Sequence, residues 1–139
     1  MTSQSINTCT PSPHSRRNIG LDILYVFCGG ATGAVARFSL SQWIGARSNA
    51  SFPIATLFIN SLGCFFIGFL LANPYIRTPG LLLLDVGFTG AFTTFSTFSY
   101  ETWRLIEQGE YLAALLNPLA SIGLGLALVV IGTSLGTLA

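Results

Sequence analysis

The chain alternates between long apolar segments and short polar ones. After a polar beginning, the apolar segments run at about residues 19–44, 53–72, 80–103 and 111–138. Each reaches the ~20 residues that a helix needs to cross ~30 Å of hydrocarbon. The stretches between them, GARSNASF, NPYIRTPG and RLIEQGE, are short and polar. The pattern predicts an all-α integral membrane protein, with four transmembrane helices forming a single domain over residues 19–139.

Residues 1–18 are rich in Ser, Thr, Asn and Pro and carry little apolar surface. A segment of this kind cannot bury enough to order itself, so we expect a disordered N-terminal tail. A cleaved secretory signal is the competing interpretation. It is disfavoured because the polar run precedes the basic pair and no convincing cleavage site follows the first apolar segment.

Composition supports the membrane assignment. The chain is 51% hydrophobic and 8% charged, with a mean hydropathy of +0.67, whereas soluble domains carry about 25% charged residues. The net charge is +1 and no basic patch is present, which argues against nucleic acid. The single histidine, His14, lies in the tail, and Cys9, Cys28 and Cys64 are far apart. This pattern predicts neither a metal-ligand set nor a disulfide framework, and we expect no enzyme activity.

The third segment contains GFTGAFTTFSTFSYE, residues 87–101, where Gly90 and a run of hydroxyl residues weaken a regular helix. Unpaired backbone at membrane depth is tolerated only where protein or a water-filled path satisfies it. A broken third helix would therefore indicate a buried ion or substrate site. Equally, Ser and Thr side chains can bond to the preceding turn of an unbroken helix. The segment alone leaves both interpretations open.

The arginines do not define one orientation. The tail and second loop hold Arg16, Arg17 and Arg77, and the opposite side holds Arg37, Arg47 and Arg104. Orientation normally follows an excess of Lys and Arg on the cytoplasmic side. Without an excess, both orientations can insert and would supply the halves of an antiparallel homodimer. A single orientation set by the basic pair of the tail is the alternative.

Small and polar residues stand within the first two apolar segments. Gly29 and Gly33 lie four residues apart, a spacing that lets helices approach closely. Arg37 follows at the same spacing; an intramembrane guanidinium usually faces the bundle or a water-filled cavity. It could draw in an anion, or it could snorkel or pair with an acid. Asn60 must find partners, either across helices or through donation to a passing anion.

Phe88, Phe92, Phe95 and Phe98 recur at helical spacing. Such a stripe is more often core than function, yet the positive edge of an aromatic ring can line an anion path without a trapping charge. Glu101, one turn beyond, is either a polar waypoint or an interfacial residue.

In the fourth segment Asn117 precedes Pro118 and could mark a helix start, and Ser121 could bond its own backbone; both are weak signals.

Together the segments resemble the Fluc/CrcB fluoride channel family. The resemblance rests on GGATGAVARF, FPIATLFINSLGCFFIGF and GFTGAFTTFSTFSYE, in that order. It implies four-helix subunits with a broken third helix, assembled in membrane lipid as an antiparallel, dual-topology homodimer with two anion pores. It also implies passive efflux of fluoride through the inner (plasma) membrane and resistance to fluoride toxicity.

The resemblance also implies site residues. Backbone carbonyls of Gly90 and Thr93, contributed by both subunits, would hold a structural Na⁺ at the dimer centre. The anion pore would be lined by Asn60, Phe95, Phe98, Ser96, Thr97 and, less directly matched, Ser121. Arg37 and Glu101 would be vestibular or structural residues. Hydrogen-bond donors along this path would replace the hydration shell of the small fluoride ion.

The chain departs from the family pattern at two positions, and two other functions compete with the channel. Ala91 stands where a second glycine is common in the family, and Cys64 stands where serine is frequent. A proton-coupled multidrug exporter would need an acidic residue deep in the first segment, whereas Asp22 lies at its start. A noncatalytic membrane assembly protein would not require the constellation at residues 90–98.

Overall fold

The computed structural model describes residues 18–48, 50–76 and 79–139. In these ranges the chain is helical, with connecting turns. The elements are α1 (Ile19–Gly45), α2 (Ile54–Ala72), the π-helix η1 (Leu82–Thr89), α3 (Gly90–Phe92), α4 (Phe95–Glu107) and α5 (Tyr111–Gly136). The predicted tail, with His14, Cys9 and two arginines, lies outside the described residues apart from Asn18, and so does Arg77.

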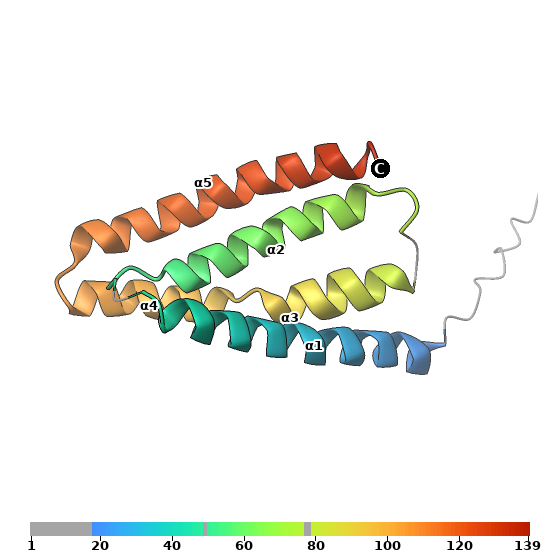
Figure 1. Cartoon of the computed structure of the whole chain (residues 1–139), viewed down its shortest axis with the longest axis horizontal. Helices are drawn as coiled ribbons and strands as arrows, with labels where there is room; N and C mark the ends of the chain where they lie inside the picture. Colours follow the sequence, from blue (N-terminus) through green and yellow to red (C-terminus); the bar gives the residue numbers. More distant parts are fainter. Residues whose placement is uncertain (1–17, 49, 77–78) are drawn as a thin grey trace, which may run out of the picture.

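Three helices, α1, α2 and α5, are long and apolar enough to cross a membrane. Their bounds lie within a few residues of the first, second and fourth predicted segments. The third segment consists of η1, α3 and α4, which follow one another along one line (Figure 1). The all-helical, multi-pass membrane architecture predicted from the apolar pattern is therefore confirmed.

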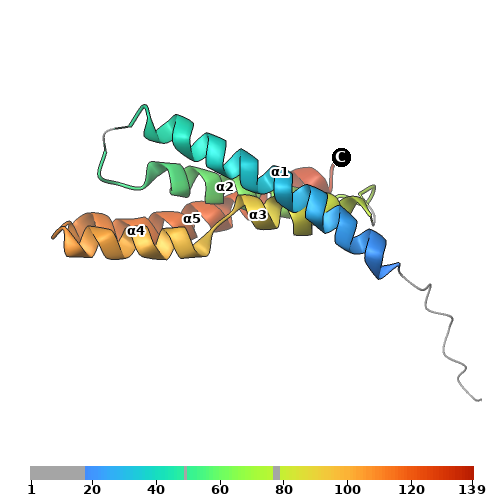
Figure 2. The ribbon, with the colours of Figure 1, turned by 90° about the horizontal axis from the view of Figure 1, so that it is seen from below.

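Each helix packs against only some of the others. α5 runs along α2, α1 lies against η1 and α3, and α4 contacts both α5 and α2. Figure 2 shows α1 crossing obliquely over the line of α3 and α4. Within the described residues α1 and α5 make no contact, so the subunit does not close into a bundle. One chain consequently leaves wide apolar faces uncovered.

Glycines set the closeness of the helix pairs. A Cβ on Gly29 would overlap the carbonyl oxygen of Leu83, and one on Gly33 would overlap that of Phe88. On α5, a Cβ on Gly132 would overlap the carbonyl oxygen of Phe65 on α2. Only a residue without a side chain lets backbones meet so closely in lipid. The predicted packing role of the small-residue spacing in α1 is confirmed.

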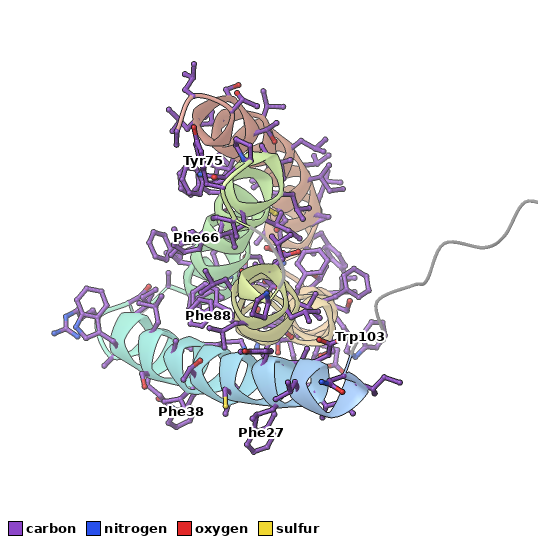
Figure 3. All side chains as sticks on the ribbon, turned by 90° about the vertical axis from the view of Figure 1, so that its right-hand side faces the viewer. Phe27, Phe38, Phe66, Tyr75, Phe88 and Trp103 are labelled. Carbon is purple, nitrogen blue, oxygen red and sulfur yellow. The ribbon has the colours of Figure 1, made fainter. Side chains whose placement is uncertain are left out.

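Few side chains are fully buried. The buried hydrophobic residues are Ile59, Leu70, Phe92, Leu105 and Ala114. By contrast, Phe27 and Phe38 point away from the other helices (Figure 3) and are 69% and 63% exposed. Exposed apolar side chains in this number mark contact with lipid or with a partner.

A tight turn reverses the chain after α4. Gly109 has φ +78, its N–H donates to the Ile106 carbonyl at 3.0 Å, and the next N–H donates to the Leu105 carbonyl at 2.9 Å. This is a Schellman ending, in which glycine adopts the left-handed conformation. It directs α5 back along α4. The interpretation of Asn117 and Pro118 as a helix start is wrong, because both lie inside α5.

Candidate ion site

The helical hydrogen bonding of the third segment stops at two threonines. Thr93 (φ −87, ψ 160) and Thr94 (φ −152, ψ 120) are extended and form the non-helical link between α3 and α4 (Figure 2). Before the link, the Thr89 carbonyl accepts from both the N–H and the Oγ1 of Thr93, at 3.1 Å each. The interruption therefore has a defined start, three residues after Gly90, which is itself helical.

The side chain of Asn60 on α2 hydrogen-bonds to the extended backbone at the interruption. Its Nδ2 donates to the Thr94 carbonyl at 2.9 Å, and its Oδ1 accepts from the Thr94 N–H at 2.8 Å. Buried backbone groups outside regular structure need such partners, and here one amide satisfies both. The cross-helix role considered for Asn60 is thus observed. An amide carries two donor hydrogens, so Nδ2 retains one beyond this pair.

The side chain of Thr94 then starts α4. Its Oγ1 accepts from the N–H of Thr97 at 3.2 Å and lies 3.1 Å from the Thr97 Oγ1 and 3.3 Å from the Ser96 Oγ. A threonine N-cap of this kind satisfies one of the free N–H groups of the first turn. Two of the predicted pore residues, Ser96 and Thr97, therefore lie in the first turn of α4, with their hydroxyls beside the cap.

Arg37 lies against the other side of the interruption. Its Nε donates to the Ala91 carbonyl at 3.2 Å, and the side chain is half-buried. Cations stabilise the free carbonyls at a helix end. Ala91 belongs to α3, and no described residue other than glycine has a positive φ. Replacing a second glycine with alanine therefore leaves the backbone unstrained.

A hollow of about 440 Å³ opens beside the two threonines. It is bounded by α2, η1, α3 and the start of α4 and is lined, among others, by Asn60, Asp85, Gly90, Thr93 and Phe95. The structure thus brings both predicted cation ligands together with two predicted pore residues. The hollow is open to the surface of the subunit.

The carbonyls of residues 89–94 differ in their partners. Those of Thr89, Ala91 and Thr94 accept hydrogen bonds. Within the described residues, no turn, cap or side-chain hydrogen bond reaches the carbonyl of Gly90 or Thr93. The same holds for Phe92, which does not line the hollow.

Oxygen ligands are what hard cations prefer. In the described ranges no group of three or more His, Cys, Asp or Glu could hold a metal. Besides the single carboxylate of Asp85, the oxygen ligands beside this hollow are hydroxyls, one amide and backbone carbonyls. Gly90 and Thr93 fit a cation such as Na⁺, because both residues line the hollow and their carbonyls are not used by turns, caps or side chains.

The phenylalanine stripe divides at the interruption. Phe88 and Phe92 stack at 5.5 Å, and Phe92 is a core residue with 3% exposure. Beyond the threonines, Phe95 and Phe98 lie 5.7 Å apart with a 40° tilt, and Phe95 is 79% exposed. The core interpretation holds for Phe92, whereas Phe88 is half-buried. The second pair presents at least one ring outward, where an ion or a partner chain can reach it.

Glu101 and Ser121 lie apart from the hollow at Asn60. Glu101 lines a separate hollow of about 390 Å³, together with Ser41, Tyr100 and Arg104. Its Oε2 and the Oγ of Ser121 are buried, and neither has a hydrogen-bond partner among the described residues. Each is therefore an unsatisfied polar atom of the isolated subunit.

Three residues of the site region, Thr102, Gly63 and Asp85, were not singled out from the sequence. The Thr102 Oγ1 accepts from the Nδ2 of Asn117 at 2.8 Å, and this bond ties α5 to α4; Asn117 is 1% exposed. Gly63 gives space to the Thr93 side chain, which a Cβ there would overlap. Asp85 lines the hollow. Only Asp85 carried a visible signal, as a charge within an apolar run.

The fold and this site define a multi-pass helical membrane protein with a polar interruption in its third segment. Residues 24–133 match the family described as CrcB-like protein, Camphor Resistance (CrcB), a range that includes the whole interruption. The chain belongs to the CrcB family.

Relatives named as ion channels cover most of the chain. A "Fluoride-specific ion channel FluC 2" of Moorella thermoacetica is 50% identical over 78% of this chain and 91% of its own length. A FluC of Dehalococcoides mccartyi is 46% identical over 84% and 93%, and one of Pyrococcus furiosus 44% identical over 80% and 92%. These names describe channels, and the chain's family is accordingly one of ion channels and not of enzymes.

Proposed function

We propose that the chain is a fluoride channel that lets fluoride leave the cell passively through the inner (plasma) membrane and so confers resistance to fluoride. One observation carries the proposal: the range that matches the family contains the interruption at Thr93 and Thr94 with its Asn60 clamp. Relatives 44–50% identical to this chain are named fluoride-specific ion channels.

The anion path is supported by donors that carry no charge. Asn60 retains one N–H beyond its bonds to Thr94, and hydroxyls of Ser96, Thr97 and Ser121 are further donors. The exposed ring of Phe95 is 5.7 Å from that of Phe98, and ring edges attract anions weakly. Weak binding at several positions lets an ion enter and also leave. The narrow, donor-lined path would favour fluoride over larger anions.

A second copy would complete the channel. The hollow at Asn60 is open, and apolar side chains such as Phe27 and Phe38 remain uncovered in one chain. The balanced arginines support insertion in both orientations. We therefore infer an antiparallel, dual-topology homodimer with two pores, in which the broken third helices of the two subunits meet.

A structural Na⁺ belongs to the same proposal. The carbonyls of Gly90 and Thr93, contributed by each subunit, would hold it at the dimer centre. The ion would supply positive charge that compensates the carbonyl dipoles brought together there. Exchanging Na⁺ for a larger monovalent cation is expected to abolish fluoride flux. Flux that is insensitive to the exchange, together with no bound Na⁺ in an experimental structure, would remove the ion from the account.

The proposed activity is tested by anion efflux from liposomes that contain the purified protein. Fluoride should leave rapidly, and chloride should leave no faster than from protein-free liposomes. Equal, negligible fluxes of both ions would refute the channel. A proton-coupled exporter is disfavoured by the position of Asp22 in the first turn of α1.

A further inference from the structure

Asp85 carries an intramembrane charge that the proposed pore does not use. It lies in the π-helix η1, and it lines the same hollow as Gly90 and Thr93. Its Oδ1 is buried and has no hydrogen-bond partner among the described residues. A carboxylate at such a position is expensive, and it is tolerated where an opposite charge compensates it.

The described arginines do not provide that charge. Arg37 donates to the Ala91 carbonyl and Arg47 to the Trp43 carbonyl, while Arg104 lies in the last turn of α4. The lining of the hollow contains no basic residue. What it does contain is the pair of free carbonyls at Gly90 and Thr93. A carboxylate beside free carbonyls is an arrangement suited to a cation.

We propose that the Asp85 carboxylate is the counter-charge of the cation held at Gly90 and Thr93, and that it raises the affinity of this site for Na⁺. The inference rests on the proposed function, because it needs the cation that the homodimer would bind. The Asp85 carboxylate attracts the cation without coordinating it, and the carbonyls of Gly90 and Thr93 remain the ligands.

The expected size of the effect follows from the spacing. Asp85 and Gly90 line the same hollow, so we take the separation of the carboxylate and the cation as roughly 7 Å. At an effective dielectric constant of about 20, the attraction between unit charges at such a separation is about 2 kcal/mol, more than a tenfold change in affinity. The homodimer contributes two such carboxylates, and their desolvation offsets part of the gain. We therefore expect removal of the charge to weaken Na⁺ binding by at least about tenfold.

The test measures thermal stability of the purified, assembled protein against Na⁺ concentration, with choline as the replacing cation. A ligand that binds only the folded state raises the melting temperature once its concentration exceeds the Kd, so the Na⁺ concentration at which the rise begins reports the affinity. Asp85→Asn should move this onset to a Na⁺ concentration about tenfold or more higher, and Asp85→Glu by less than about threefold. Asp22→Asn, a charge on α1 outside the hollow, should leave the onset unchanged. Equal onset concentrations for Asp85→Asn and wild type would overturn the inference.

A second measurement on the wild-type protein covers the case in which Asp85→Asn does not assemble. A hydrophobic carbodiimide labels membrane carboxyl groups, and mass spectrometry gives the labelling rate at each site. Na⁺ should slow labelling of Asp85 and leave that of Asp22 unchanged, and equal rates at Asp85 with and without Na⁺ would contradict the inference. Fluoride flux from liposomes distinguishes failure of this inference from failure of the proposed function. Intact flux without any Na⁺ response overturns the cation and Asp85 alone, whereas no flux overturns the channel itself.

Discussion

The clamp between Asn60 and Thr94 gives the most quantitative prediction. Asn60→Ala removes two hydrogen bonds, of 2.9 and 2.8 Å, to the carbonyl and N–H of Thr94. A fully buried group that loses its only partner costs about 1–3 kcal/mol, so two such losses would cost about 2–6 kcal/mol. Because both bonds are only partly buried and the unfolded segment also finds partners in a membrane, we expect the lower part of this range, about 2–4 kcal/mol.

The measurement is unfolding of the purified protein in mixed micelles of increasing SDS fraction, followed by the near-ultraviolet signal of its tryptophans. Asn73→Ala is the matched control, because the Asn73 Oδ1 also accepts a backbone N–H, that of Tyr75 at 2.9 Å, but in an exposed turn. It should cost about 0.5–1 kcal/mol. The reasoning fails if Asn60→Ala is no more destabilising than Asn73→Ala. Where the Asn60 variant still assembles, fluoride flux should fall at least about tenfold, because the variant also loses the amide donor proposed for the anion path.

Two further predictions concern the neighbours of this clamp. Gly63→Ala places a methyl group where the Thr93 side chain lies and should cut fluoride flux by about tenfold or more; Gly20→Ala, with open space around it, should not, and equal flux in both variants would contradict the packing argument. Phe95→Ile or Phe98→Ile should leave assembly intact and reduce fluoride efflux at least about tenfold, because an aliphatic side chain has no positive edge. Undiminished efflux in both phenylalanine variants would end their pore role.

The apolar pattern was sufficient for the helices. The first, second and fourth segments appear as α1, α2 and α5, because ~20 apolar residues leave few other solutions in hydrocarbon. The spacing of Gly29 and Gly33 correctly indicated close packing, since a backbone-to-backbone contact leaves no space for a side chain. Periodicity of this kind is local, and local information defines a helix.

The site depended on tertiary contacts that periodicity does not contain. Gly90 suggested where the helix weakens, yet the extended residues are Thr93 and Thr94, and Asn60 on another helix supplies their bonds. Asn117 suggested a helix start, whereas it is buried within α5. Which carbonyls stay free is decided by partners 34 or 54 residues away. The family resemblance named Gly90 and Thr93, and spacing alone did not.

Selective conduction is tested most directly by the reversal potential of current through the purified protein in a planar bilayer. With a tenfold fluoride gradient and symmetrical chloride, a fluoride-selective channel should reverse about 59 mV from zero, at the fluoride equilibrium potential. Changing the pH on one side should not move this value. Reversal at zero, a shift with pH, or no current in fluoride would contradict a passive fluoride channel.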